Sequence, residues 1–409
     1  MGRKFQTSAS TPTFTSEDVN IFIYEFAKTY LYKLANKQVK DGQLEIVSMT
    51  AGVFHDYFYL KLPTASDDEN GSEIHINDGV VLATVQYCKK LYQVCVSKFK
   101  RYDENTYFML QAQGTGEGAR FTSGLLSHIK KGAIAASSYN NSALEAVPSS
   151  ENANTEIDIK PIPGFTDSLS ELFLPAHINE SISLFVKTLC NFETDKKSLR
   201  YLFSGKPGTA KTKIIRAIAN TCKGKATFIF TNGSETRIDK LFDLTKIFSP
   251  VVICIDDIDL MTGTREDGTQ SRVLAAFLQK MDGFVDTNFF FLGTTNDKKM
   301  VDLAASRPGR FDMIIDVDQI NQSSYFDLIK SKTKNDKVLR LFDNGMLVLL
   351  QEKKVTGAFI CNLVKHLELI DRHNPTLLNE LYVNQIISEQ QNGFYNIPEF
   401  DRKKIGFAG

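Results

Sequence analysis

Apolar side chains recur at helical spacing near the start of the chain, at Ile23, Phe26, Tyr30 and Leu34. This spacing predicts a helix with one face turned to a core. We predict Ser16 as its N-cap, because a Ser hydroxyl can accept a hydrogen bond from a free backbone N–H of the first turn.

Strand-like apolar runs follow at 53–62 and 106–113, and the stretch 80–96 is apolar without a clear period. Runs of this kind favour β-strands. We therefore interpret residues 16–135 as an N-terminal α+β domain that binds a substrate or partner. A Ser/Thr-rich flexible tail is expected before it, at residues 1–15.

A Ser-, Asn- and Ala-rich stretch then interrupts the pattern, and we predict a linker over residues 136–163. Beyond it, short apolar runs alternate with helical segments, which is typical of a parallel sheet with crossover helices. The candidate strands are Leu199–Phe203, Thr227–Phe230, Val251–Ile255, Asn288–Leu292 and Met313–Ile315. The pattern predicts an α/β core with a five-stranded parallel sheet at 164–320, a helical lid at 321–392 and a C-terminal tail at 393–409.

Composition narrows the possible functions. With 42% hydrophobic and 23% charged residues, the chain of 409 residues has the balance of a globular protein. Its 48 Lys and Arg equal its 48 Asp and Glu, so no overall positive field attracts nucleic acid. The cysteines are widely spaced and lack a Cys-x-x-Cys pair, which favours a reducing, cytoplasmic location. No apolar run approaches the roughly 18 residues of a membrane span, so we expect no membrane segment.

A glycine-rich loop between a predicted strand and a predicted helix is the strongest chemical signal. Its residues are Gly205, Lys206, Pro207, Gly208, Thr209, Ala210, Lys211 and Thr212. Such a loop directs backbone N–H groups and a helix N-terminus at phosphates. Lys211 is expected to neutralise phosphate oxygens, and the Thr212 hydroxyl is expected to contact Mg²⁺. Ala210 stands where the pattern usually has glycine. The loop predicts a site for ATP with Mg²⁺.

Polar residues follow two of the predicted strands directly. Asp256 and Asp257 come after one strand, and Asn296 comes after the next. The carboxyl edge of a parallel sheet is where α/β proteins bind their ligands. We predict that Asp256 belongs to the Mg²⁺ shell, that Asp257 polarises the attacking water, and that Asn296 positions this water and the γ-phosphate.

Two arginines, Arg307 and Arg310, flank a Pro-Gly turn further along the chain. The guanidinium group is suited to spreading the charge of a transferring phosphoryl group. We therefore predict a catalytic role for both.

Taken together, these motifs resemble those of AAA ATPases over about residues 165–371. The resemblance implies a Walker A loop at Gly205–Thr212, a Walker B pair at Asp256 and Asp257, a sensor Asn296, a lid-helix start at Gly357 beside the nucleotide, and arginine fingers at Arg307 and Arg310. It also implies ATP hydrolysis in a homo-oligomeric ring, a hexamer or a heptamer, whose arginines act on a neighbouring subunit.

Within this family the chain resembles the type of mitochondrial chaperone that inserts the Rieske protein during complex III assembly. The resemblance lies in the short segment Thr231–Arg237 and in Asp257, where Glu is more usual. Ala210 resembles the loop of minichromosome-maintenance helicases. AAA unfoldases usually carry an aromatic gripping loop where Thr231–Arg237 stands, and the loop 261–268 is polar. We therefore expect a ring that does not thread unfolded chains.

Three functions remain open. The first is an ATP-driven remodeller or chaperone of a protein client. The second is a nucleic-acid motor or loader, which the zero net charge and the lack of a basic, aromatic-interleaved run disfavour. The third is a regulatory ATPase whose nucleotide state switches assembly.

Overall fold

The computed structural model forms two compact units, Met1–Asn140 and Asn141–Gly409. The residues that it describes are 12–52, 80–100, 106–115, 119–148, 157–233, 237–262, 270–283, 289–297, 309–317 and 322–395. The strand-like run at 53–62 and the tail at 396–409 lie outside the described residues.

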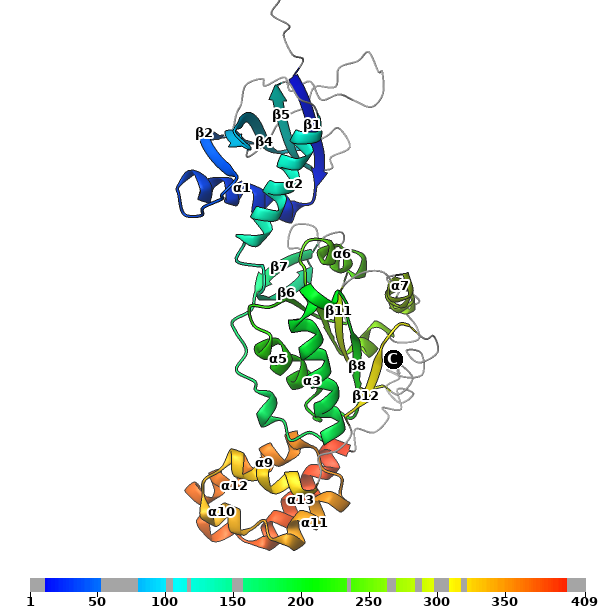
Figure 1. Cartoon of the computed structure of the whole chain (residues 1–409). Helices are drawn as coiled ribbons and strands as arrows, with labels where there is room; N and C mark the ends of the chain where they lie inside the picture. The colour runs from blue at the N-terminus through cyan, green and yellow to red at the C-terminus, as the bar shows by residue number, and fades with distance from the viewer. Residues whose placement is uncertain are drawn as a thin grey trace, which may run out of the picture. The chain divides into compact units, whose positions relative to one another are not determined.

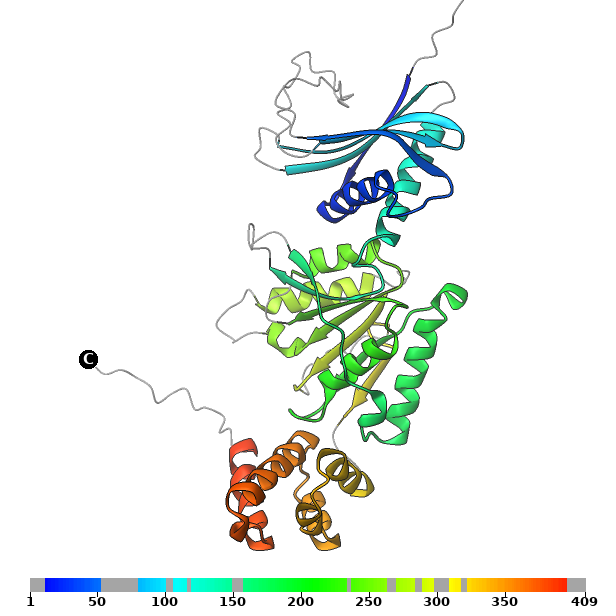
Figure 2. The ribbon, with the colours of Figure 1, turned by 90° about the vertical axis from the view of Figure 1, so that its left-hand side faces the viewer.

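The first unit is an antiparallel sheet covered on one face by two helices, which confirms the separate α+β domain. Its strands are β1 (Pro12–Val19), β2 (Leu44–Gly52), β3 (Val80–Tyr87), β4 (Lys90–Lys100) and β5 (Thr106–Thr115). They are arranged in the order β1-β5-β4-β3-β2. Figure 2 shows α1 (Ile21–Ala35) and α2 (Ala119–Ala135) on the same side of this sheet.

The predicted first helix is present, but its predicted cap is wrong. Ser16 lies in β1, where it pairs with Gln111 of β5. The cap is Asn20, whose side chain accepts a hydrogen bond from the backbone N of Ile23 at 2.9 Å. Ser and Asn are both good caps. The sequence alone could not reveal that residues 12–19 pair with a strand nearly 100 positions away.

The second unit is built on a seven-stranded, mostly parallel sheet with the order β12-β8-β11-β10-β9-β6-β7. Its strands are β6 (Ala143–Pro148), β7 (Ile157–Pro161), β8 (Arg200–Ser204), β9 (Thr227–Asn232), β10 (Val251–Asp256), β11 (Phe290–Thr295) and β12 (Met313–Asp316). The last five match the predicted strands, so the α/β core is confirmed.

The prediction of a linker at 136–163 is wrong where the chain forms two additional strands, β6 and β7. β6 runs parallel to β9, and β7 pairs with β6 in the antiparallel direction. Leu144, Ala146, Ile157 and Ile159 are buried there. These four apolar residues alternate with polar ones over only two short segments, so the Ser- and Asn-rich surroundings hid the strand period. The sheet therefore has seven strands where we predicted five.

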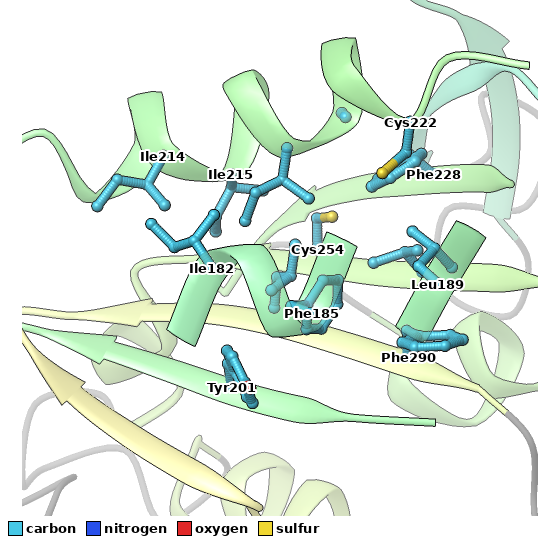
Figure 3. Packing of buried hydrophobic residues seen from close by; sticks show 14 of the residues in the cluster. Ile182, Phe185, Leu189, Tyr201, Ile214, Ile215, Cys222, Phe228, Cys254 and Phe290 are labelled. Atoms are coloured by element: carbon cyan, nitrogen blue, oxygen red, sulfur yellow. The ribbon is translucent and has the colours of Figure 1, made fainter. Parts of the chain in front are cut away.

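Helices cover both faces of this sheet (Figure 1). One face packs against α3 (Ala176–Cys190) and α5 (Lys211–Thr221), and Figure 3 shows their apolar side chains meeting those of the strands. The other face packs against α6 (Ile238–Asp243) and α7 (Gln270–Gly283) through aromatic rings. This three-layer packing fixes the strand ends that carry the predicted site.

A helical lid follows the sheet, as predicted. Its helices are α9 (Gln322–Lys332), α10 (Asp336–Arg340), α11 (Asn344–Glu352), α12 (Gly357–His373) and α13 (Glu380–Tyr395). They share an apolar core of their own, centred on the inward face of α12.

Replacing Tyr201 with Phe is expected to raise the free energy of unfolding by about 1 kcal/mol, because it removes a buried polar group that has no partner. The Tyr201 side chain is 1% exposed, and its hydroxyl has no hydrogen-bond partner in the described part of the chain. Its ring packs 5.2 Å from that of Phe185. Thermal unfolding of the two proteins measures the difference.

The matched control is Tyr325→Phe. Tyr325 is also 1% exposed, but its hydroxyl donates a hydrogen bond to the carbonyl of Val355 at 3.1 Å. This control should lose about 1 kcal/mol. Equal losses from both substitutions would contradict the prediction for Tyr201.

Candidate functional site

The glycine-rich loop joins β8 to α5 through left-handed backbone conformations. Gly205 has φ 148°, Gly208 has φ 82° and Ala210 has φ 73°. A Cβ at Gly205 would lie 2.6 Å from the carbonyl oxygen of Val317, so only glycine fits there. Ala210 is the N-cap of α5 and adopts the conformation that glycine prefers, at a cost of about 1 kcal/mol. The loop thus has its turn despite the departure at Ala210.

The Lys211 ammonium lies in a cage of oxygen atoms. Its Nζ donates to the carbonyls of Gly205 at 2.8 Å and Lys206 at 2.9 Å, and to Oδ1 of Asn296 at 2.8 Å. The residue is 6% exposed. Asn296 follows β11, which is the neighbour of β8 in the sheet, so the predicted lysine and the predicted sensor meet directly. A phosphate group offers oxygens of the kind that now surround the ammonium.

Oxygen atoms suited to a magnesium ion gather beside it. The Thr212 hydroxyl lies 3.0 and 2.9 Å from the two carboxylate oxygens of Asp256. Hydroxyl and carboxylate oxygens are the hard ligands that Mg²⁺ binds through one or two protein groups. The donor set therefore fits the ion predicted for this position.

Thr294, which the sequence reading missed, holds both aspartates in place. Its hydroxyl donates to Oδ1 of Asp256 at 2.5 Å and accepts from the backbone N of Asp257 at 2.9 Å. The side chain is fully buried in β11. The sequence feature that could have indicated this role is a hydroxyl residue two positions before Asn296, on the strand beside β10.

Asp257 faces Asn296, whose Nδ2 donates to its Oδ1 at 2.9 Å. Burial raises the pKa of the Asp257 carboxyl, and the nearby charges of Asp256 and Asp259 raise it further. The hydrogen bond from Asn296 and the charge of Lys211 act in the opposite direction. A carboxylate with a raised pKa is a better proton acceptor, which suits a group that polarises water.

Asp259 is a second residue that the sequence reading missed. Its Oδ1 accepts hydrogen bonds from the Thr295 hydroxyl at 2.9 Å and from the backbone N of Asn296 at 3.0 Å. These bonds fix the turn that presents the Asn296 side chain. The sequence feature that could have indicated this role is a third carboxylate two residues after Asp257.

A cleft of about 540 Å³ opens over these groups, a size within the range of small-molecule sites. The predicted residues in its wall are Pro207, Gly208, Thr209, Ala210, Lys211, Thr212, Asp257, Asn296 and Gly357. The segment before α3 adds Leu172 and Leu174, which the sequence reading did not include. Their apolar side chains can cover the flat face of a base.

The lid closes this cleft at the start of α12. The backbone N of Ala358 donates to the carbonyl of Gly208 at 3.3 Å. A Cβ at Gly208 would lie 3.0 Å from the Thr356 hydroxyl, which belongs to the cap of α12. Gly357 therefore lies beside the loop, where the sequence placed it.

The structure brings neither predicted arginine into the described part of this site. Arg307 lies outside the described residues. Arg310 is 7% exposed and is absent from the described wall of the cleft. To reach the phosphate of another subunit, its side chain would have to leave the position that it has here. The finger roles of both residues stay predictions.

This site has the arrangement of a P-loop nucleoside triphosphatase. A glycine-rich turn lies between a strand and a helix, and carboxylates and a polar amide lie at the ends of adjacent parallel strands. Residues 201–319 match the model of the ATPase family associated with various cellular activities (AAA). Residues 201–319 are therefore similar to the AAA ATPase domain, as the motifs predicted. The likeness to the Rieske-protein chaperone type stays a prediction.

Two relatives illustrate how far the similarity extends. The chain is 30% identical over 230 residues to the mitochondrial inner membrane i-AAA protease supercomplex subunit YME1 of Saccharomyces cerevisiae, over 52% of this chain and 29% of the relative. It is 29% identical over 220 residues to the ATP-dependent zinc metalloprotease FtsH 2 of a Thermoanaerobacter species, over 48% of this chain and 40% of the relative. The chain thus spans less than half the length of either protein. Across the described residues, no helix combines the length and apolarity needed to cross a bilayer.

Proposed function

We propose that this chain hydrolyses ATP in the presence of Mg²⁺ and uses the energy to remodel or chaperone a protein client. The observation that carries the proposal is one connected network. It joins Lys211 to Asn296, Asn296 to Asp257, and Thr212 to Asp256, across three adjacent strand ends. The Thr294 hydroxyl connects the two parts, because it bonds both Asp256 and the backbone of Asp257.

We assign a task to each group of this network. Lys211 and the backbone N–H groups of the loop bind the phosphates, and Thr212 with Asp256 would hold the metal ion. When bound, the ion neutralises charge on the phosphate oxygens. Asp257 and Asn296 orient the attacking water, and Asp257 accepts its proton as the bond to phosphorus forms.

We further propose that the active form is a homo-oligomeric ring, a hexamer or a heptamer. The resemblance to AAA ATPases implies such a ring. In this arrangement Arg307 and Arg310 of one subunit act on the nucleotide of its neighbour. The N-terminal unit, with its sheet and two helices, is the part that we expect to bind the client.

The connection from β9 to α6 supports remodelling without threading. Only residues 233–237 separate Asn232, the last residue of β9, from Ile238, the first of α6. None of the five is aromatic. We therefore propose that nucleotide changes open, close or reorient the N-terminal unit around a folded or assembled partner.

The relatives' names suggest a protease as another function, but this sequence gives it no support. It contains no His-Glu-x-x-His pattern, the helical motif that binds zinc in many metalloproteases.

All six cysteines are free thiols, which supports a reducing compartment such as the cytoplasm.

The test is the ATPase activity of the purified chain with and without Mg²⁺, beside a Lys211→Ala variant. We expect Mg²⁺-dependent phosphate release from the wild type and loss of nucleotide binding in the variant, because Lys211 is the buried cation of the phosphate site. Wild-type turnover that cannot be distinguished from the Lys211→Ala background would contradict the proposal.

A further inference from the structure

A buried arginine outside the cleft contacts the segment that carries Arg310. Arg200 is the first residue of β8 and is 6% exposed. Its Nη1 donates to the carbonyl of Met281 at 3.1 Å and to the carbonyl of Gly309 at 3.4 Å. One guanidinium thus joins the end of α7 to the turn that begins at Gly309.

The backbone of Arg200 holds the other end of the same turn. Its N–H donates to Oδ2 of Asp312 at 2.8 Å, and the N–H of Asp312 donates back to its carbonyl at 2.9 Å. The next residue, Met313, begins β12, which lies beside β8 (Figure 1). Arg310 therefore stands between two points, Gly309 and Asp312, that are both fixed by Arg200.

Burying the charged group of an arginine at this position costs free energy. Burial lowers the pKa of the Arg200 guanidinium, and the charge of Asp312 opposes that effect. The guanidinium carbon lies 5.0 Å from the centre of the Phe289 ring, a cation–π contact that offsets part of this cost. What arginine provides and an apolar side chain lacks is a donor that reaches both carbonyls, since Nη1 binds Met281 and Gly309 at once.

We propose that Arg200 is a positioning residue for phosphoryl transfer, which holds the Gly309–Asp312 turn so that Arg310 on it can act on the neighbouring subunit. The inference rests on the proposed ring with arginines acting in trans. Arg200 itself is not in the described wall of the cleft. Its loss should therefore impair the site of the neighbour and leave its own subunit able to bind ATP.

The experiment compares Arg200→Met and Arg200→Lys, each alone and mixed with Lys211→Ala subunits. Loss of hydrogen bonds to a charged group corresponds to a roughly 10- to 100-fold fall in turnover for Arg200→Met. Its affinity for a fluorescent ATP analogue should match the wild type. Arg200→Lys keeps the charge and the N–H donors on a shorter side chain, so its turnover should fall between those of Arg200→Met and the wild type.

The mixture separates positioning from a general structural role. Arg200→Met subunits keep an intact cleft, and Lys211→Ala subunits keep an intact turn. Their mixture should therefore exceed the summed activities of the two variants. The reference is the mixture of Arg307→Ala with Lys211→Ala, which tests action in trans without Arg200.

Four results would overturn the inference. If the Arg200→Met variant hydrolysed ATP as fast as the wild type, the turn would need no such anchor. Loss of ATP binding by Arg200→Met, or absence of rescue where the reference mixture is rescued, would show that Arg200 supports only its own subunit. Failure of both mixtures, with ATPase activity still present in the wild type, would refute action in trans and this inference with it.

Discussion

An Asp257→Asn variant is expected to bind ATP with nearly normal affinity and to hydrolyse it about 100-fold more slowly or worse, the range typical for loss of a general base. The substitution keeps the shape of the side chain, but an amide cannot accept the proton of the attacking water. The cage around Lys211 and the pair formed by Thr212 and Asp256 do not depend on this carboxylate. The Asp257→Asn variant should therefore lose ATP hydrolysis while it retains ATP binding.

Single-turnover hydrolysis and equilibrium titration with ATP measure the two properties independently. Asp243→Asn is the matched control, because Asp243 is a half-exposed aspartate on α6 that pairs with Lys246 at 2.7 Å. It should behave as the wild type. A variant of Asp257 whose turnover stays within one order of magnitude of the wild type would remove this residue from the chemistry.

The phosphate site was predictable because its chemistry demands particular residue types in a fixed order. A turn that approaches phosphates needs glycines, and Gly205 and Gly208 have the positive φ values that such a turn requires. Acidic and amide residues directly after apolar runs predicted that Asp257 and Asn296 belong to one site, because parallel strands bring their carboxyl ends to one edge, and the two side chains are indeed in contact. Local patterns were sufficient wherever the function depends on one short segment.

Contacts between distant segments were not predictable in this way. Thr294 and Asp259 look like ordinary strand-end residues until the pairing of β10 with β11 places them beside Asp256 and Asn296. Arg200 looks like a charged residue at the start of a strand, and only the packing of α7 and the turn at Gly309 around it brings the carbonyls of Met281 and Gly309 to its guanidinium. Such roles depend on register, which a single sequence does not specify.

The errors in the fold have a similar cause. β6 and β7 contain too few alternating apolar residues to indicate strands, yet they are stable because β9 offers an edge to pair with. Ser16 and Asn20 are equivalent as caps by residue type, and the pairing of β1 with β5 decides between them. In both cases a long-range partner overrides the local preference.

Mixing Arg307→Ala subunits with Lys211→Ala subunits is expected to restore ATP hydrolysis that neither variant shows alone. An arginine supplied in trans contributes about 10³–10⁵ in rate in related phosphoryl-transfer enzymes, so each pure variant should be nearly inactive. The first variant has an intact cleft and lacks the finger, whereas the second has the finger and lacks the phosphate-binding lysine. A mixed ring contains interfaces at which an intact cleft meets an intact finger.

The same geometry predicts that wild-type turnover per subunit rises with protein concentration, because an isolated subunit lacks the arginine of a neighbour. Arg310, which is 7% exposed within its own chain, gives a second variant for the mixture, and rescue of Arg310→Ala would indicate that its side chain moves toward the neighbour in the ring. Light scattering at each concentration relates turnover to assembly. A constant turnover per subunit from a species that scatters as a monomer would mean that each cleft is complete by itself, and the arginines would then have no role in trans.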